Sequence, residues 1–114
     1  RGFILGAALA EKLNAGFVMA RKPGKLPAET IEETYTKEYG VDSIQVHKDA
    51  IDENDIVLLH DDLLATGGTM AAAHRLVKKC GAKQTYINFV IELVELNGRK
   101  AFPENVEITS LLVK

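Results

Sequence analysis

The sequence lacks several features that would place it in whole classes of protein. It has one cysteine, Cys80, so no intrachain disulfide can form, and this cysteine usage fits a reducing cytosol. No apolar run approaches the ~20 residues that a membrane-spanning helix needs. With 14 basic and 16 acidic residues, the chain has a net charge of −2. That balance argues against bulk nucleic-acid binding, for which a basic face is expected.

Two kinds of site are also missing from the motif pattern. The three histidines and Cys80 have no zinc-type spacing, so we predict no metal site built from protein side chains alone. No Gly-Lys-Ser/Thr sequence follows a glycine-rich loop, which excludes a Walker-type ATPase. We expect His60 to be a hydrogen-bonded strand residue, and His47 and His74 to lie on the surface.

The length and the apolar content set the scale of the fold. At 114 residues and 46% apolar composition, the chain is predicted to be a globular domain or a piece of one. There is no internal repeat and no low-complexity tract. Because the chain begins with Arg1 rather than Met, and inside a motif, we expect an N-terminal portion to be missing.

The most informative segment runs from Val57 to Thr69. It is an apolar run, then the carboxylates Asp61 and Asp62, then a small loop, then a helix-forming stretch from Met70. This order places two carboxylates and a helix N-terminus at the carboxyl end of a strand, where open α/β sheets bind ligands. The helix amides attract phosphate, whereas carboxylates suit sugar hydroxyls or a divalent cation. We interpret the segment as a site for a phosphorylated ribose.

Simpler interpretations of these residues exist. An isolated Asp-Asp pair caps a turn about as often as it binds a ligand. Thr69 could be the N-cap of the helix that follows, a role compatible with phosphate binding because both use the same donors. A phospho-acceptor signalling domain also clusters aspartates at a strand end, but it would not need the Thr66–Thr69 loop.

The remaining pattern predicts alternating helices and strands, and therefore an α/β fold with an open parallel sheet, flanking helices and right-handed crossovers. We expect helices at 2–14, with Gly16 as its C-cap, and at 70–80, with Ala72, Ala73, Leu76 and Val77 on its inner face. Strands are expected at 17–20, 56–60 (the central strand), 86–93 and 106–112. Residues 21–28 should form a loop, 30–39 and 43–47 a ribbon standing off the sheet, and 98–102 a short helical turn.

Three ordered motifs resemble one known family. Asp61–Thr69 is similar to the phosphoribosyl-pyrophosphate binding motif of the type I phosphoribosyltransferases, and Leu63–Ala65 is most similar to their adenine-specific branch. Arg1–Ile4 resembles the family's pyrophosphate-binding turn. Arg21–Pro27, followed by Glu38–Gly40, resembles its mobile active-site loop. The similarity extends from Arg1 to about Leu112 in the family's order.

The resemblance implies a role for each candidate residue. Asp61 and Asp62 would accept hydrogen bonds from the ribose hydroxyls and favour positive charge on the sugar, and Glu38 would handle a proton of the base. The ribose 5-phosphate would lie on the loop, and the pyrophosphate would meet a set of cations with Tyr39 closing the site. The loop set is Ala65, Thr66, Gly67, Gly68 and Thr69; the pyrophosphate set is Arg1, Arg21, Lys22, Lys25 and Tyr39.

The resemblance also implies a whole-protein function. By resemblance, the intact protein would be a cytoplasmic purine-salvage enzyme that joins adenine to phosphoribosyl pyrophosphate, works as a homodimer and receives Mg²⁺ with the substrate. Residues 1–114 would be its core domain, without the base-covering hood and first strand that the family places upstream. Three alternatives remain: transfer to a different purine or pyrimidine, a regulator that keeps the phosphoribosyl site, and an inactive fragment of a true transferase.

Overall fold

The computed structural model describes residues 1–27, 29–37 and 39–114. Its elements follow the chain in the order α1 (Gly2–Lys12), β1 (Thr30–Lys37), β2 (Gly40–His47), β3 (Ile56–Leu64), α2 (Gly68–Lys79), β4 (Gln84–Glu92), the 3-10 turns η1 (Val94–Leu96) and η2 (Gly98–Ala101), and β5 (Ile108–Val113). Within the described ranges, no helix is long and apolar enough to cross a membrane.

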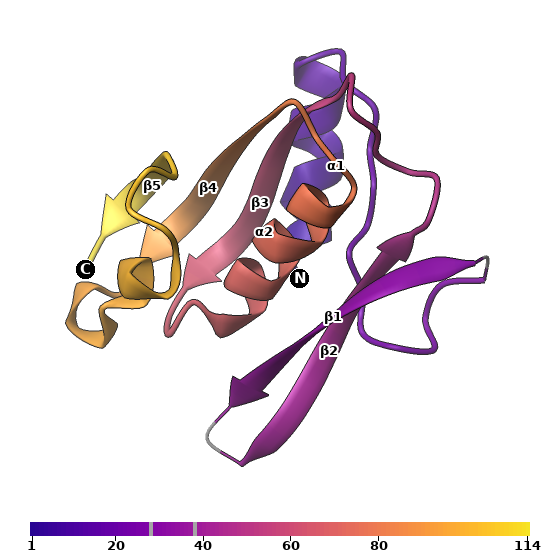
Figure 1. Ribbon diagram of the computed structural model, residues 1–114. Helices are drawn as coiled ribbons and strands as arrows, with labels where there is room; N and C mark the ends of the chain where they lie inside the picture. Colours follow the sequence, from indigo (N-terminus) through magenta and orange to yellow (C-terminus); the bar gives the residue numbers. More distant parts are fainter. Residues whose placement is uncertain (28, 38) are drawn as a thin grey trace.

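Strands β3, β4 and β5 form a parallel sheet with β4 in the middle. Helix α2 connects β3 to β4 and packs in front of the sheet, while α1 lies behind β3 (Figure 1). This confirms the predicted parallel α/β architecture with flanking helices. The prediction that β3 is central is wrong for the described residues, because it pairs with β4 alone and forms an edge.

Strands β1 and β2 form a separate antiparallel ribbon, as predicted. It lies below α2 in Figure 1, and Ile44 and Val46 on one face of β2 are buried in the core. Side chains alternate across a strand, so residues of the same parity share this inner face. Only one face of the ribbon therefore contributes to the core.

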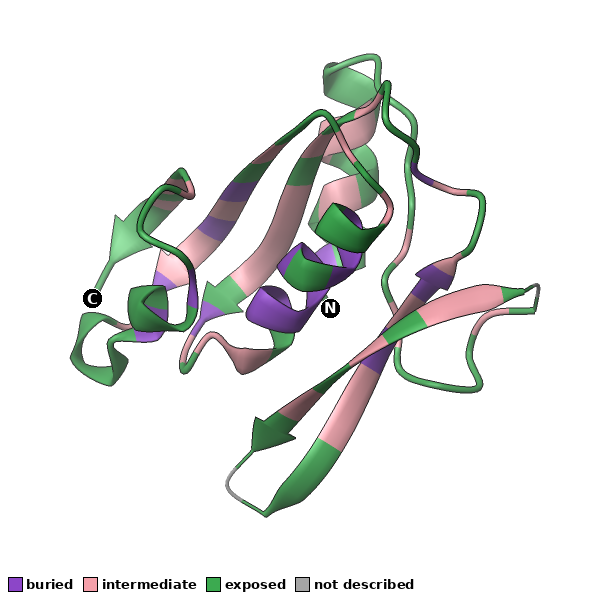
Figure 2. Cartoon of the chain, in the orientation of Figure 1, coloured by how far each residue is buried: buried purple, intermediate pink, exposed green. Residues whose placement is uncertain are grey.

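Helix α2 is the most deeply buried element (Figure 2). The predicted inner face is confirmed: Leu76 and Ala72 have no exposed surface, and Ala73 and Val77 are nearly fully buried. The surface prediction for His74 is wrong, because this side chain is 4% exposed and its ring packs edge-on against that of Phe102. The sheet, the ribbon and the η2 region all contact α2, which leaves little of its circumference to solvent.

Two local predictions near the N-terminus are wrong. Residues 17–20 form no strand, and Phe17 and Val18 are exposed, because this segment has no ladder partner until Arg21 pairs with Gln45. Helix α1 forms as predicted but ends before Gly16. Asn14 takes the left-handed conformation, with φ 53°, that was expected of the glycine.

Candidate active site

Asp61 and Asp62 lie near the carboxyl end of β3, where the sequence pattern placed them. Both side chains are partly buried, and the Asp62 N–H donates a hydrogen bond to Asp61 Oδ1 over 2.9 Å. Burial raises the pKa of Asp61, and the neighbouring Asp62 carboxyl raises it further, whereas the Asp62 N–H lowers it. The pair is a concentrated and incompletely compensated negative charge, which donors or a cation would stabilise.

The loop after β3 turns directly into α2. Gly67 is the N-cap of the helix in the left-handed conformation, with φ 87°, and no side chain caps the helix. Thr69 is therefore not the N-cap but belongs to the first turn of α2. The first amides of the helix have no intrahelical partner, and the helix dipole adds partial positive charge there. The loop of Ala65–Thr69 thus presents donors suited to a phosphate.

The start of α1 adjoins the two carboxylates. Gly2 is buried against Asp61 so closely that a Cβ on Gly2 would lie 2.8 Å from the Asp61 Cα. The Arg21 guanidinium lies over the ring of Phe3, 5.8 Å from its centre, in the first turn of the same helix. Arg1, which precedes Gly2, therefore lies next to the residue that packs on Asp61, and Arg21 lies against the first turn of the same helix.

The other loop cations do not meet the carboxylates in this structure. Lys22 forms an ion pair with Asp42 of β2, to which Lys37 also contributes at 3.4 Å. This contact lowers the pKa of Asp42 to about 2 and raises that of Lys22. From sequence, Lys22 had no evident acidic partner, because Asp42 is twenty positions away and only the ribbon brings it near. Lys25 is exposed.

The ribbon is fastened to the helix that begins at the loop. Glu33 of β1 accepts a hydrogen bond from Arg75 Nε at 3.0 Å and forms an ion pair with Lys79, both on α2. These two cations lower the pKa of Glu33, Lys79 most. The same strand carries Tyr35, whose ring carbon Cδ2 lies 3.6 Å from the position of a Cβ on Gly68. The phenol of Tyr35 therefore lies beside the start of α2, a placement that the motif pattern did not predict.

Two predicted residues remain, Glu38 and Tyr39. Tyr39 lies between β1 and β2 and is 86% exposed. Glu38, predicted to handle a proton of the base, lies outside the described residues.

Behind the loop is a turn whose role sequence reasoning missed. The η2 turn was predicted as a helical turn, but nothing in its sequence showed that Gly98 packs on the loop. A Cβ on Gly67 would lie 2.5 Å from the Gly98 carbonyl oxygen. The only sequence signal was a glycine placed at the start of the turn.

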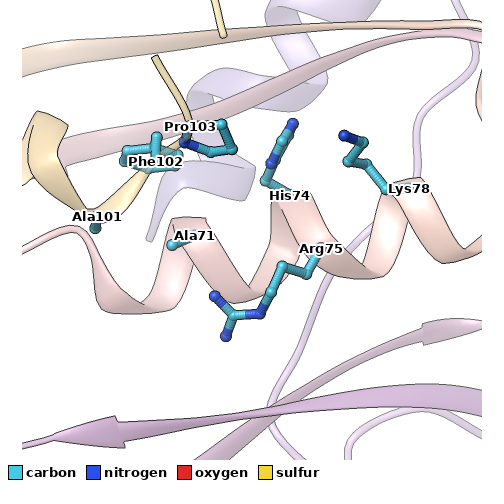
Figure 3. Close-up of a pocket in the computed structure, with 7 residues that line it drawn as sticks. All are labelled: Ala71, His74, Arg75, Lys78, Ala101, Phe102 and Pro103. Atoms are coloured by element: carbon cyan, nitrogen blue, oxygen red, sulfur yellow. The ribbon is translucent and has the colours of Figure 1, made fainter. Parts of the chain in front are cut away.

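A groove of about 370 Å³ lies between α2 and the segment 101–103 at the end of η2 (Figure 3). His74 and Lys78 project to one side of the helix, and Arg75 projects to the other, toward the ribbon. None of the residues predicted to bind substrate lines the groove. This groove and the candidate chemistry are therefore in different places.

Metal binding by protein ligands alone has no support among the described residues, where no group of three or more His, Cys, Asp or Glu side chains converges. The Asp61–Asp62 pair offers hard oxygen ligands that suit a hydrated Mg²⁺. Its raised Asp61 pKa reflects a carboxylate whose charge a cation would stabilise. Two carboxylates suit Mg²⁺, which keeps several of its waters and takes further oxygen ligands from substrate phosphates.

Comparisons with known proteins agree on one family. Residues 1–106 match the family described as "Phosphoribosyl transferase domain". An adenine phosphoribosyltransferase of Phocaeicola vulgatus is 76% identical over 112 residues, which cover 98% of this chain and 64% of that protein. The chain thus spans about 64% of the length of this curated relative.

Solved structures are similar over the whole described fold. The adenine phosphoribosyltransferase of Rhodothermus marinus has a TM-score of 0.94 and 50% identity, covering 98% of this chain and 64% of its own. That of Trypanosoma brucei, solved with AMP, pyrophosphate and ribose-5-phosphate, has a TM-score of 0.90 and 36% identity, covering 99% and 52%. The fold that positions Asp61, Asp62 and the loop is therefore shared with both.

Proposed function

The chain belongs to the phosphoribosyl transferase domain family, and on that premise we propose that its protein transfers the 5-phosphoribosyl group of phosphoribosyl pyrophosphate to adenine. The products are AMP and pyrophosphate. Adenine as the acceptor is supported by the Phocaeicola vulgatus relative and by the solved neighbours, which are adenine phosphoribosyltransferases. The choice of base rests on this similarity.

One observation carries the proposal: two partly buried carboxylates and an uncapped helix N-terminus follow each other on one strand–loop–helix unit. A phosphorylated ribose presents the complementary groups, with hydroxyls at one end and a phosphate at the other. In our proposal, Asp61 and Asp62 accept hydrogen bonds from the 2- and 3-hydroxyls. The amides and hydroxyls of Ala65, Thr66, Gly67, Gly68 and Thr69 hold the 5-phosphate.

Catalysis would come from charge placed near the reacting carbon. Substitution at a sugar C1 passes through a state with positive charge on the ring, as in glycoside hydrolysis. A carboxylate pair beside the ring stabilises that charge where it develops, which lowers the barrier rather than only tightening binding. We assign Arg1 and Arg21, with Lys22 and Lys25, to the departing pyrophosphate, whose charge grows as the C1–O bond breaks.

The ion pair between Lys22 and Asp42 bears on this assignment. It is exposed, and such pairs contribute little to stability, so Lys22 can exchange Asp42 for a pyrophosphate oxygen at small cost. Tyr39 closes the site and Glu38 handles a proton of the base. The whole protein is a cytoplasmic homodimer that uses Mg²⁺, which supplies charge neutralisation for the pyrophosphate when bound.

The proposal is tested by supplying the intact protein with phosphoribosyl pyrophosphate and Mg²⁺, together with one base at a time. Adenine, hypoxanthine, guanine and orotate are compared by chromatography of the nucleotide products. We expect AMP from adenine, with at least a tenfold lower rate for the other bases, because a site that hydrogen-bonds one base leaves polar groups unpaired with another.

A faster reaction with hypoxanthine, guanine or orotate would identify a different transferase of the same family. Binding of phosphoribosyl pyrophosphate with no nucleotide from any base would contradict the transferase activity. A phosphoribosyl-binding regulator would account for that outcome.

A further inference from the structure

The phosphate loop and the η2 turn are packed backbone to backbone. A Cβ on Gly67 would lie 2.5 Å from the Gly98 carbonyl oxygen and 3.0 Å from the Ala101 Cβ. A Cβ on Gly98 would in turn lie closer than 3 Å to the carbonyl oxygen of Ala65 and to the Leu64 side chain. Real Cβ atoms essentially never lie so close to another atom. Each segment therefore fits the other only because both have a glycine at the contact.

A two-pronged ion pair fixes the η2 turn. Arg99 donates from Nε to Glu92 Oε2 and from Nη2 to Glu92 Oε1, both over 2.9 Å, and from Nη1 to the Ile108 carbonyl over 3.0 Å. Ser110 also donates to Glu92 Oε1, over 2.8 Å. Glu92 is 7% exposed, and Arg99 lowers its pKa most. This fork geometry defines both the position and the orientation of the guanidinium.

The pair also joins the turn to the end of the sheet. Glu92 is the last residue of β4, and its carbonyl accepts from the Lys114 N–H over 2.8 Å. The next residue, Leu93, donates its N–H to the carbonyl of Leu64, where β3 ends and the phosphate loop begins. Arg99 therefore connects the turn behind the loop to the strand ends on which the loop is built.

We propose that the Arg99–Glu92 ion pair fixes the η2 turn, and that the η2 turn in turn supports the phosphate loop in its phosphate-binding conformation. Arg99 is then a positioning residue for the ribose 5-phosphate. This inference rests on the proposed function. The loop contains Gly67 and Gly68, and glycine gives a chain more conformations than any other residue. A loop that is ordered before the ligand arrives does not lose that freedom on binding, so affinity is higher.

The test compares Arg99→Met and Arg99→Lys with Lys100→Met in the intact protein. Lys100 lies in the same turn, is exposed and has no part in the ion pair. Its replacement therefore removes a neighbouring charge and leaves the Arg99–Glu92 ion pair in place. Arg99→Lys keeps the charge and loses the fork. Two probes are titrated separately: ribose 5-phosphate, and pyrophosphate with Mg²⁺. The order of the loop amides without ligand is measured by NMR relaxation.

We expect Arg99→Met to weaken ribose 5-phosphate binding about tenfold, which corresponds to about 1.4 kcal/mol of ordering free energy. Pyrophosphate binding should stay within twofold of the wild type, because Arg1 precedes α1 and the other cations of its set lie on the loop that begins at Arg21. The amides of Thr66–Thr69 should become less ordered in the variant. Arg99→Lys should fall between the wild type and Arg99→Met, and Lys100→Met should match the wild type.

A purely structural role would lower the affinity for both probes together, and that result would overturn the positioning role. Loop amides that are equally ordered in Arg99→Met and the wild type would contradict the proposal that the η2 turn orders the phosphate loop. If the wild type itself failed to bind ribose 5-phosphate, the proposed function would be wrong, whatever the order of the loop.

Discussion

The double substitution Asp61→Asn/Asp62→Asn should abolish measurable phosphoribosyl transfer, with each single substitution lowering kcat about 10²–10³-fold. Removing one preorganised electrostatic group from a transition-state site commonly has an effect of about this size. Asn keeps the shape and an oxygen acceptor, so the hydrogen bond from the Asp62 N–H to the side chain at position 61 can persist. What the variant loses is the negative charge beside the ring. Steady-state kinetics with adenine and phosphoribosyl pyrophosphate measure the effect.

Stability separates this effect from misfolding. Because burial raises the Asp61 pKa in the folded state, the ionised form is disfavoured there, and folding stability falls as pH rises through that pKa. A neutral Asn removes this penalty, so Asp61→Asn should be at least as stable as the wild type at pH 7. Asp49→Asn, an exposed substitution outside the site, is the matched control and should retain activity. An active double variant would contradict the role of the carboxylates.

Gly2→Ala should lower activity by about 10²-fold, although Gly2 carries no side chain to act on the substrate. The Cβ of an alanine at position 2 would lie 2.8 Å from the Asp61 Cα. Because this is a backbone atom, no side-chain rotation can relieve the clash. Either α1 or the end of β3 must therefore move. A displacement of about 1 Å in a catalytic group can cost about 10²-fold in rate, and overpacking costs about 1–3 kcal/mol of stability. Kinetics and denaturant unfolding measure the two effects.

Gly16→Ala is the matched control for this substitution. Gly16 has no atom within 4 Å of the position its Cβ would take, and its φ is not positive, so alanine fits there without strain. We expect this variant to keep the activity of the wild type and to be no less stable, since alanine restricts the unfolded chain. If Gly2→Ala were as active as Gly16→Ala, the tight contact between α1 and Asp61 would have no functional role.

The sequence could predict the loop because its signal is local. Asp61, Asp62 and Gly67 lie within seven consecutive positions, and the strand–loop–helix order alone determines that their groups converge. The same reasoning located the ribbon, whose strands β1 and β2 are adjacent in sequence. It also located the buried face of α2, whose spacing follows the helical period.

Two of the features that the sequence did not predict depend on contacts between distant segments. The strand expected at Phe17–Ala20 has the right composition, but a strand exists only through a ladder partner, and the described chain provides none there. Gly98 lies about thirty positions after Gly67 and meets it only because β3, α2 and β4 bring the two turns together. No period or spacing in the sequence reports a contact of that kind.

The most direct test of the account is a titration of ¹⁵N-labelled protein with phosphoribosyl pyrophosphate and Mg²⁺, followed residue by residue in amide NMR spectra. We expect the largest shifts at Asp61, Asp62 and Ala65–Thr69, with smaller ones at Gly2 and none along the groove beside His74. Shifts confined to that groove, or no shift in a folded protein at millimolar ligand, would contradict the assignment of the Asp61–Thr69 segment as the ribose-phosphate site.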